Sequence, residues 1–214
     1  MPALPIAEDA AGFILAGGRS SRMGSDKALV QLRGRPLVEI AVETFRSIGF
    51  DPRIAGARSS LHGFAPVVED LHPDQGPMSG IHAALTASTA SWNLFLPVDM
   101  PLMPVSLLRL LLERAILTGS PVTAIQLNGR MLPFPAVLHR SVLPHIEQCM
   151  ASRQLACRSA WQAIPSAFSA RLDAPSVETL RTLGLCSHPR GLAPHLWFHG
   201  ANTPSDLAFI HGLL

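Results

Sequence analysis

The chain has 214 residues, 48% of them hydrophobic and 15% charged, and its formal net charge is +2. A chain of this length and composition can bury a full core and suits one compact α/β domain. The small net charge and the lack of like-charge runs give no indication of a nucleic-acid partner or an anionic membrane surface. Because no uninterrupted apolar segment reaches about 18 residues, the sequence also predicts no membrane span.

The three cysteines, Cys149, Cys157 and Cys186, include no CxxC pair. Their odd number and their spacing predict neither a disulfide framework nor a zinc site. This usage is typical of a reducing compartment, so we expect a cytoplasmic protein.

The first residues do not have the pattern of a signal peptide. Glu8 and Asp9 precede a very short apolar run, which is the reverse of the order found in secretory signals. We therefore expect residues 1–11 to form a flexible leader and residues 12–214 to form a single domain.

The first predicted strand is a short apolar run over residues 12–16. It breaks at Gly17 and Gly18, where the chain can turn without a Cβ in the way. Glycine-rich backbone can direct N–H groups at an anion, and Arg22 and Lys27 add positive charge within ten residues. The stretch favours a polyphosphate site, although neither the P-loop pattern nor GxGxxG is present. The alternative is a Gly-rich turn with solvated arginines.

Strands and helices then alternate. Pro36 is suited to the first position of a helix, whose apolar residues recur at helical spacing as far as Ile48, and Gly49 ends it. Residues 52–57 and 65–68 are predicted as the second and third strands. This alternation predicts a parallel, layered α/β sheet.

A polar loop follows the third strand and leads into a helix expected over about residues 79–90. Asp70 lies at the end of that strand. Ligands in open α/β sheets bind at the carboxyl ends of strands, so Asp70 is expected on the same edge as the glycine loop. The alternative is a carboxylate that caps the helix, which suits Asp74 better than Asp70.

The fourth predicted strand, residues 92–96, is nearly continuously apolar, as expected at the centre of a parallel sheet. Asp99 follows it, between Pro97 and Pro101. A carboxylate directly after a buried strand is poorly explained by packing. We therefore favour metal binding by Asp99 over a simple turn residue.

The later elements are expected at 104–117 (helix), 122–126 (strand), 129–138 (turn and extended segment), 141–184 (interrupted helices) and 196–198 (strand). Thr203 and Pro204 then have the pattern of a helix N-cap followed by the first helical residue.

Residues 15–27 read LAGGRSSRMGSDK. This stretch resembles the signature loop of nucleotidyltransferases, in particular that of the molybdenum cofactor guanylyltransferase family. Further motifs resemble the family in the same order, namely Glu69-Asp70, the GPMSG of residues 76–80, the PVDMP of residues 97–101 and the NTPSDL of residues 202–207. The resemblance implies a three-layer α/β/α Rossmann-like nucleotidyltransferase fold with a mostly parallel central sheet.

The resemblance also implies roles for particular residues. The backbone expected to hold GTP is that of Leu15, Ala16, Gly17 and Gly18. Arg22 and Lys27 are expected over the β- and γ-phosphates, and Asp70 against the guanosine. Asp99, the third catalytic residue, is expected to bind Mg²⁺, with Asn202 as a second ligand. Gly200 stands where the family has an Asn, so part of the metal or acceptor shell is expected to be missing.

The implied reaction is transfer of GMP from GTP to the terminal phosphate of molybdenum-molybdopterin, with release of pyrophosphate. Transient contacts with molybdenum-insertion proteins or molybdoenzymes are implied as well. GTP is favoured over CTP because cytidylyl relatives read LAAG where this chain has Gly17, whose missing Cβ is expected to leave room for guanine. The alternatives are a cytidylyltransferase for the same pterin, a sugar-phosphate nucleotidyltransferase and a degenerate nucleotide-binding chaperone for molybdoenzymes.

Overall fold

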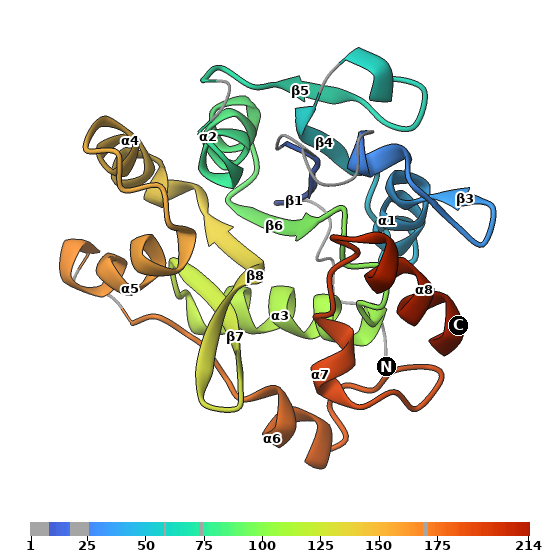
Figure 1. The fold of residues 1–214 in the computed structure, drawn as a ribbon. Helices are drawn as coiled ribbons and strands as arrows, with labels where there is room; N and C mark the ends of the chain where they lie inside the picture. Colours follow the sequence, from blue (N-terminus) through green and yellow to red (C-terminus); the bar gives the residue numbers. More distant parts are fainter. Residues whose placement is uncertain (1–8, 18–25, 58, 73–74, 169–170) are drawn as a thin grey trace.

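The computed structural model describes residues 9–17, 26–57, 59–72, 75–168 and 171–214. A six-stranded sheet forms its centre, with the strand order β5-β4-β1-β6-β8-β7 (Figure 1). These strands are β1 Ala10–Leu15, β4 Arg53–Ala57, β5 Val67–Glu69, β6 Trp92–Pro97, β7 Val122–Leu127 and β8 Arg130–His139.

The first four strands of this order are mutually parallel, and β8 runs antiparallel to both of its neighbours, β6 and β7. The turn between β7 and β8 contains Asn128 and Gly129 with φ of 51° and 72°, the backbone of a tight hairpin turn. The mostly parallel sheet is thereby confirmed.

The two central strands are apolar on both faces because helices cover both sides of the sheet. Phe13 of β1 is paired with Phe95 of β6, and their stacked rings lie 5.5 Å apart between centroids. Phe13 and Leu15 pack with Met78 in a cluster on one face of the sheet, whereas Ile14 packs in a second cluster on the opposite face. This alternation is the period of two that a strand imposes.

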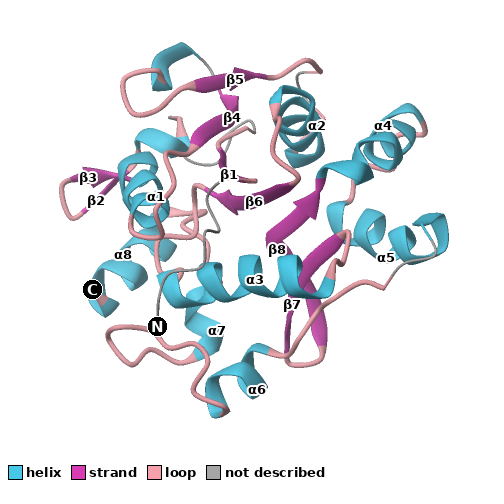
Figure 2. Cartoon of the chain, turned by 180° about the vertical axis from the view of Figure 1, so that it is seen from behind, coloured by secondary structure: helices cyan, strands magenta, loops and turns pink. Residues whose placement is uncertain are grey.

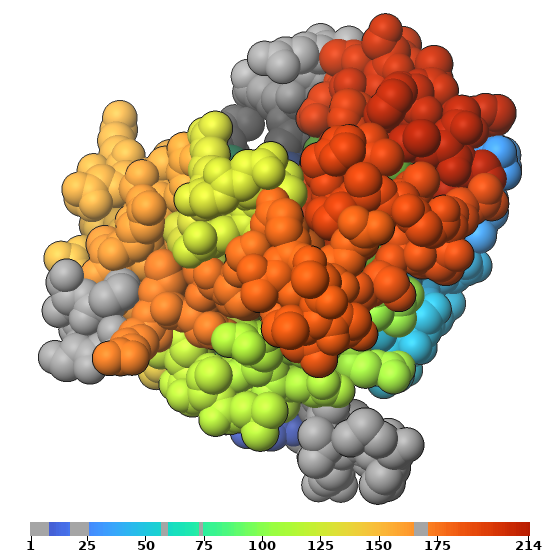
Figure 3. Space-filling view, turned by 90° about the horizontal axis from the view of Figure 1, so that it is seen from below, coloured from blue at the N-terminus to red at the C-terminus, as the bar shows by residue number. Residues whose placement is uncertain are grey.

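Helices form the outer layers (Figures 1 and 2). One face carries α2 Pro77–Ala87, α4 Leu143–Ala151 and α5 Cys157–Phe168. The other face carries α1 Leu37–Arg46, α3 Val105–Thr118, α6 Val177–Thr182, α7 Pro194–Trp197 and α8 Pro204–Leu213. The three-layer α/β/α architecture is confirmed, and Figure 3 shows the C-terminal elements, in orange and red, covering much of the surface seen from below.

The remaining elements are short. A two-stranded ribbon of β2 Gln31–Leu32 and β3 Arg35–Pro36 precedes α1. Single 3₁₀ turns occur at η1 Lys27–Leu29, η2 Ser59–Leu61 and η3 Arg140–Val142. No helix within the described residues is both long and apolar enough to cross a membrane.

Several predicted boundaries change. β1 begins at Ala10, two residues before the expected start of the domain, because Ala10 and Ala11 pair with the beginning of β6. α1 ends at Arg46, and the turn that follows reaches Gly49, whose φ is +89°. α2 begins at Pro77, which takes the first-turn position that proline favours.

The strand expected over residues 196–198 is wrong, because Pro194–Trp197 forms one turn of helix. Three bulky apolar residues favour a strand only if a sheet edge is available to pair with. Here Pro194 begins the turn, and fully buried Trp197 donates its indole N–H to the Leu192 carbonyl at 2.9 Å.

Candidate active site

Two central strands end side by side and set the position of the site. Leu15, the last residue of β1, is paired with Pro97, the last residue of β6. The Val98 N–H donates to the Leu15 carbonyl at 3.0 Å, so the sheet continues one residue beyond β6. The next residue is Asp99, which therefore leaves the sheet at the carboxyl edge of its parallel strands, as the sequence predicts.

Lys27 joins Asp99 to a distant part of the chain. Its ammonium donates to Asp99 Oδ2 at 2.5 Å and to Asn202 Oδ1 at 2.6 Å, across sequence separations of 72 and 175 residues. The side chains of Lys27 and Asp99 are 23% and 20% exposed, so this contact is partly shielded from water. Hydrogen bonds with charged partners are stronger than neutral ones. The structure thus brings together Lys27, Asp99 and Asn202, three of the residues predicted for the site.

Local hydrogen bonds hold Lys27 and Asn202 in place. The Asp26 carboxylate accepts from the Ala28 N–H at 3.1 Å and caps the 3₁₀ turn that carries Lys27. The Ala201 N–H donates to the Asp99 carbonyl at 2.8 Å, which fixes the chain before Asn202 against the segment after β6.

The predicted N-cap of α8 is confirmed. The Asp206 N–H donates to the Thr203 hydroxyl at 3.1 Å, and that hydroxyl donates to Asp206 Oδ2 at 2.9 Å. This hydrogen bond from Thr203 is the main reason that the pKa of Asp206 lies below its ordinary value. The same oxygen accepts from the Asn202 N–H at 3.1 Å, so the cap also orients the residue that faces Lys27.

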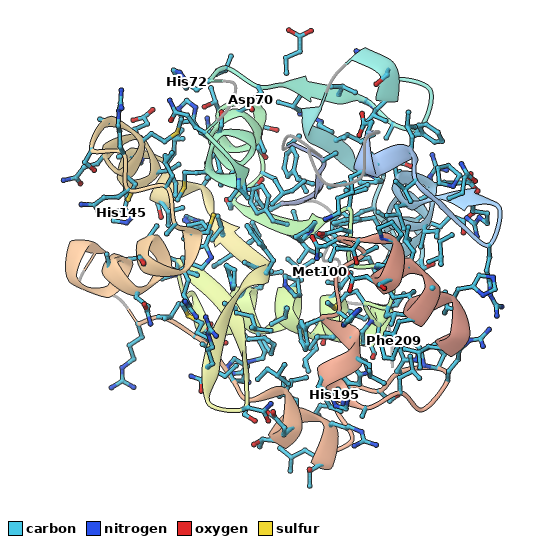
Figure 4. The ribbon with its side chains drawn as sticks, in the orientation of Figure 1. Asp70, His72, Met100, His145, His195 and Phe209 are labelled. Carbon is cyan, nitrogen blue, oxygen red and sulfur yellow. The ribbon has the colours of Figure 1, made fainter. Side chains whose placement is uncertain are left out.

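Asp70 lies on the same edge of the sheet but away from Asp99. It follows β5, and strands β4 and β1 separate β5 from β6, which corresponds to ~14 Å at ordinary strand spacing. Figure 4 shows Asp70 beside α2 and Met100, the neighbour of Asp99, toward α8. Asp70 Oδ1 accepts from the Ser79 hydroxyl and from the His72 N–H, the latter at 3.0 Å, so it ties the loop to α2.

The structure describes the glycine loop only in part. Gly18 and Arg22, predicted for nucleotide binding and catalysis, lie outside the described residues. The Ala16 N–H donates to the Ala55 carbonyl at 3.0 Å, and the Leu15 carbonyl accepts from Val98. These two hydrogen bonds belong to the sheet, so the Ala16 N–H is not free to bind a phosphate. The expectation that the backbone of residues 15–18 holds GTP stays a prediction.

The expectation that Gly17 leaves room for a base is corrected by the structure. A Cβ added to Gly17 would lie 2.9 Å from the Gly56 carbonyl oxygen and 3.3 Å from its Cα. A Cβ on Gly56 would in turn meet the Gly17 Cα at 3.1 Å, and one on Gly80 would meet the Gly56 N at 3.4 Å. Three glycines therefore let β1, β4 and α2 approach closely, and the missing Cβ of Gly17 makes room for the backbone of β4.

Residues 12–167 match the MobA-like NTP transferase domain. The molybdenum cofactor guanylyltransferase of Serratia proteamaculans is 35% identical over 150 residues, which cover 67% of this chain and 75% of that protein. The probable molybdenum cofactor guanylyltransferase of Deinococcus radiodurans is 30% identical over 200 residues, covering 93% of this chain and 92% of that protein. This chain belongs to the MobA-like NTP transferase domain family.

Solved structures agree on the fold of this MobA-like domain. The molybdopterin-guanine dinucleotide biosynthesis protein A from Archaeoglobus fulgidus superposes with a TM-score of 0.76 at 21% identity, covering 95% of this chain and 97% of that one. The 2-C-methyl-D-erythritol 4-phosphate cytidylyltransferase from Thermus thermophilus has a TM-score of 0.64 at 16% identity, over 94% and 96% of the two chains. Both are similar to this chain in their α/β fold.

The sequence reasoning missed the packing roles of Gly56, Gly80 and Gly200 in this MobA-like domain. The position of Gly56 could have been noticed in the sequence, because a glycine within a predicted strand often marks a close backbone approach. In the structure Gly56 has a φ of +74° near the end of β4. A Cβ on Gly200 would lie 2.6 Å from Asn202 Nδ2 and 3.4 Å from Asp99 Oδ2. Glycine at this position therefore makes room for the Asn202 amide beside Asp99.

We expect Gly17→Ala to lower the free energy of unfolding by about 1–3 kcal/mol, because the added methyl group meets backbone that cannot rotate away. Urea unfolding of the variant measures this loss. Gly212→Ala is the matched control, since a Cβ there meets nothing within 4 Å. A Gly17→Ala protein as stable as the wild type, with an altered choice of nucleotide, would restore the role of Gly17 at the base.

We expect Gly200→Ala to leave stability within about 1 kcal/mol of the wild type, because the added Cβ meets the movable end of a side chain. It should nevertheless lower the rate of nucleotidyl transfer by about 10- to 100-fold, since Asn202 is pushed from its place beside Lys27. Urea unfolding and pyrophosphate release measure the two effects. An unchanged rate would show that the reaction does not require Asn202 in this position.

Proposed function

We propose that this protein transfers GMP from GTP to the terminal phosphate of molybdenum-molybdopterin, releasing pyrophosphate and forming the molybdopterin guanine dinucleotide cofactor. The names of its relatives support this reaction. The observation that carries the proposal is the meeting of Lys27, Asp99 and Asn202 at the carboxyl edge of the parallel strands. Such an edge is where ligands bind in open α/β sheets.

The chemistry requires charge neutralisation and positioning. A phosphate monoester is anionic near neutral pH, so the acceptor can attack the α-phosphorus of GTP without a general base. Negative charge then builds up on the departing pyrophosphate, and fixed positive groups stabilise it. We assign this role to the Lys27 ammonium, together with the Arg22 guanidinium as the sequence predicts.

Nucleotidyltransferases generally use a divalent metal, and the residues present fit one. Asp99 Oδ2 and Asn202 Oδ1 converge on a single cationic nitrogen, which shows that both oxygens can face one positive centre. Carboxylate and amide oxygens are hard ligands, and Mg²⁺ is commonly held by one or two protein oxygens with substrate phosphates and water completing its shell. We therefore propose that Asp99 and Asn202 hold Mg²⁺, which when bound neutralises phosphate charge.

The separation of Asp70 from Asp99 along the edge of the sheet suggests how the nucleotide is oriented. If the phosphates lie at Lys27 and Asp99, a nucleotide that crosses the ends of β1 and β4 brings its base toward Asp70. The described hydrogen bonds to Asp70 from His72 and Ser79 both fall on Oδ1. We propose Oδ2 as an acceptor for the adjacent N1–H and N2–H donors of guanine. Cytosine has no such adjacent pair, since its N4 amino donor lies beside the N3 acceptor.

We further place the reaction in the cytoplasm, where transient contacts with molybdenum-insertion proteins or molybdoenzymes would pass on the product. The three cysteines, all free and buried, are compatible with a reducing compartment.

The test is pyrophosphate release from each NTP with Mg²⁺, with and without molybdenum-loaded molybdopterin. We expect acceptor-dependent release that is faster with GTP than with CTP. Faster release from CTP would replace the guanylyl assignment with a cytidylyl one. Release that depends on a sugar phosphate would assign a sugar phosphate as the acceptor in place of molybdopterin. No release with any acceptor would favour a nucleotide-binding chaperone over an enzyme.

A further inference from the structure

Lys27 is the only lysine in the chain. The chain has 17 lysine and arginine residues together, and the other 16 are arginines. The two side chains differ as cations. An ammonium is a compact point charge with three donors, whereas a guanidinium is a planar fork suited to bidentate pairing. The nitrogen of the single lysine contacts two side-chain oxygens, those of Asp99 and Asn202, which come from distant parts of the chain.

The contact has the form of a small cation site. One nitrogen lies 2.5 Å from Asp99 Oδ2 and 2.6 Å from Asn202 Oδ1. A metal ion such as Mg²⁺ or Mn²⁺ would use the same two oxygens, at distances of about 2.0–2.1 Å for Mg²⁺. The ammonium and the metal therefore cannot both occupy the space between these oxygens.

We propose that the Lys27 ammonium is the resident cation of this site, occupying in the nucleotide-free protein the place between Asp99 and Asn202 that a divalent cation takes when nucleotide binds. This inference rests on the proposed function, since it assumes that metal and nucleotide share the site. The triphosphate attracts Lys27 away from the two oxygens and brings the metal to them. Lys27 thus makes metal binding dependent on nucleotide, and it passes from the protein carboxylate to a phosphate without leaving the site.

The direct test measures Mn²⁺ binding to the full chain without nucleotide. The electron paramagnetic resonance signal of free Mn²⁺ decreases as the ion binds, and this decrease reports the binding. Lys27→Met keeps the length of the side chain and removes the charge. Because two charge-assisted hydrogen bonds no longer compete with the metal, we expect the dissociation constant for Mn²⁺ to fall by roughly tenfold or more. Thermal unfolding of the variant establishes that it is folded.

Arg35→Met is the matched control, because it also removes one positive charge. Arg35 pairs with Glu39 at 2.8 Å and with Glu43 at 2.5 Å, carboxylates of α1 rather than of the site. We expect its Mn²⁺ affinity to equal that of the wild type. A gain in Lys27→Met no larger than the gain in Arg35→Met would overturn the proposal, since the effect would then be one of net charge.

The wild-type protein provides a second measurement that does not require a variant. In a nuclear magnetic resonance spectrum, selective ¹⁵N-lysine labelling gives one side-chain ammonium signal, because the chain has one lysine. We expect this signal to shift when GTP and Mg²⁺ are added together, as Lys27 leaves the carboxylate for a phosphate. Calorimetry of GTP binding separates a failure of the proposed function from a failure of the inference about Lys27. Absence of GTP binding would contradict the proposed function, whereas GTP binding with an unmoved lysine signal would overturn the inference about Lys27.

Discussion

Asp99→Ala is expected to lower nucleotidyl transfer by at least about 100-fold while leaving the protein folded. The carboxylate is the charged oxygen ligand of the site, and removal of such a group from a transition state commonly costs ~3 kcal/mol or more. Stability should change little, because Lys27 keeps its contact with Asn202 and the carbonyl of residue 99 still accepts from the Ala201 N–H. Pyrophosphate release with GTP, acceptor and Mg²⁺ measures the first effect, and thermal unfolding measures the second.

Two further variants identify the cause of that loss. Asp99→Asn keeps the shape and removes the charge, and we expect it to be impaired as strongly as Asp99→Ala. Asp51→Ala removes a carboxylate that is 95% exposed and 3.7 Å from Arg46, and it should behave as the wild type. Turnover at the wild-type rate in Asp99→Ala with Mg²⁺ would end the assignment of Asp99 as a metal ligand.

Lys27→Ala is expected to lower the rate by about 30- to 1000-fold, or roughly 2–4 kcal/mol, by analogy with the loss of an oxyanion donor. The melting temperature should stay close to that of the wild type. The 3₁₀ turn at Lys27 is capped by Asp26 through the backbone of Ala28, and this contact does not involve the lysine side chain. Single-turnover kinetics and thermal unfolding of the same preparation measure both quantities.

Lys27→Arg distinguishes a point charge from a general need for a cation. A guanidinium keeps the charge but presents it as a wider fork, so we expect only a minor recovery of the rate. A Lys27→Ala protein that is unstable, yet fully active when folded, would mean that Lys27 has a structural role. Recovery to the wild-type rate in Lys27→Arg would show that position 27 requires charge and no particular geometry.

The sequence was a good guide wherever the signal was local. The apolar run that became β6 predicted a central strand, and Asp99 between two prolines stood out because packing does not explain it. Thr203 and Pro204 predicted the start of α8, since a cap depends on neighbouring residues only. The same local reasoning failed for α7, because a short apolar segment becomes a strand only when a sheet edge is available to it.

Segment order, the alternation of strand and helix and the residue types of the site were determined by the sequence itself, because periodicity, prolines and glycines act over a few residues. The tertiary structure decided which distant groups meet. It inserted β8 antiparallel between β6 and β7, and it brought Asn202 to Lys27 across 175 residues. It also showed that Gly17 accommodates the Gly56 backbone. These outcomes depend on strand pairing and close packing between segments, which no local pattern specifies.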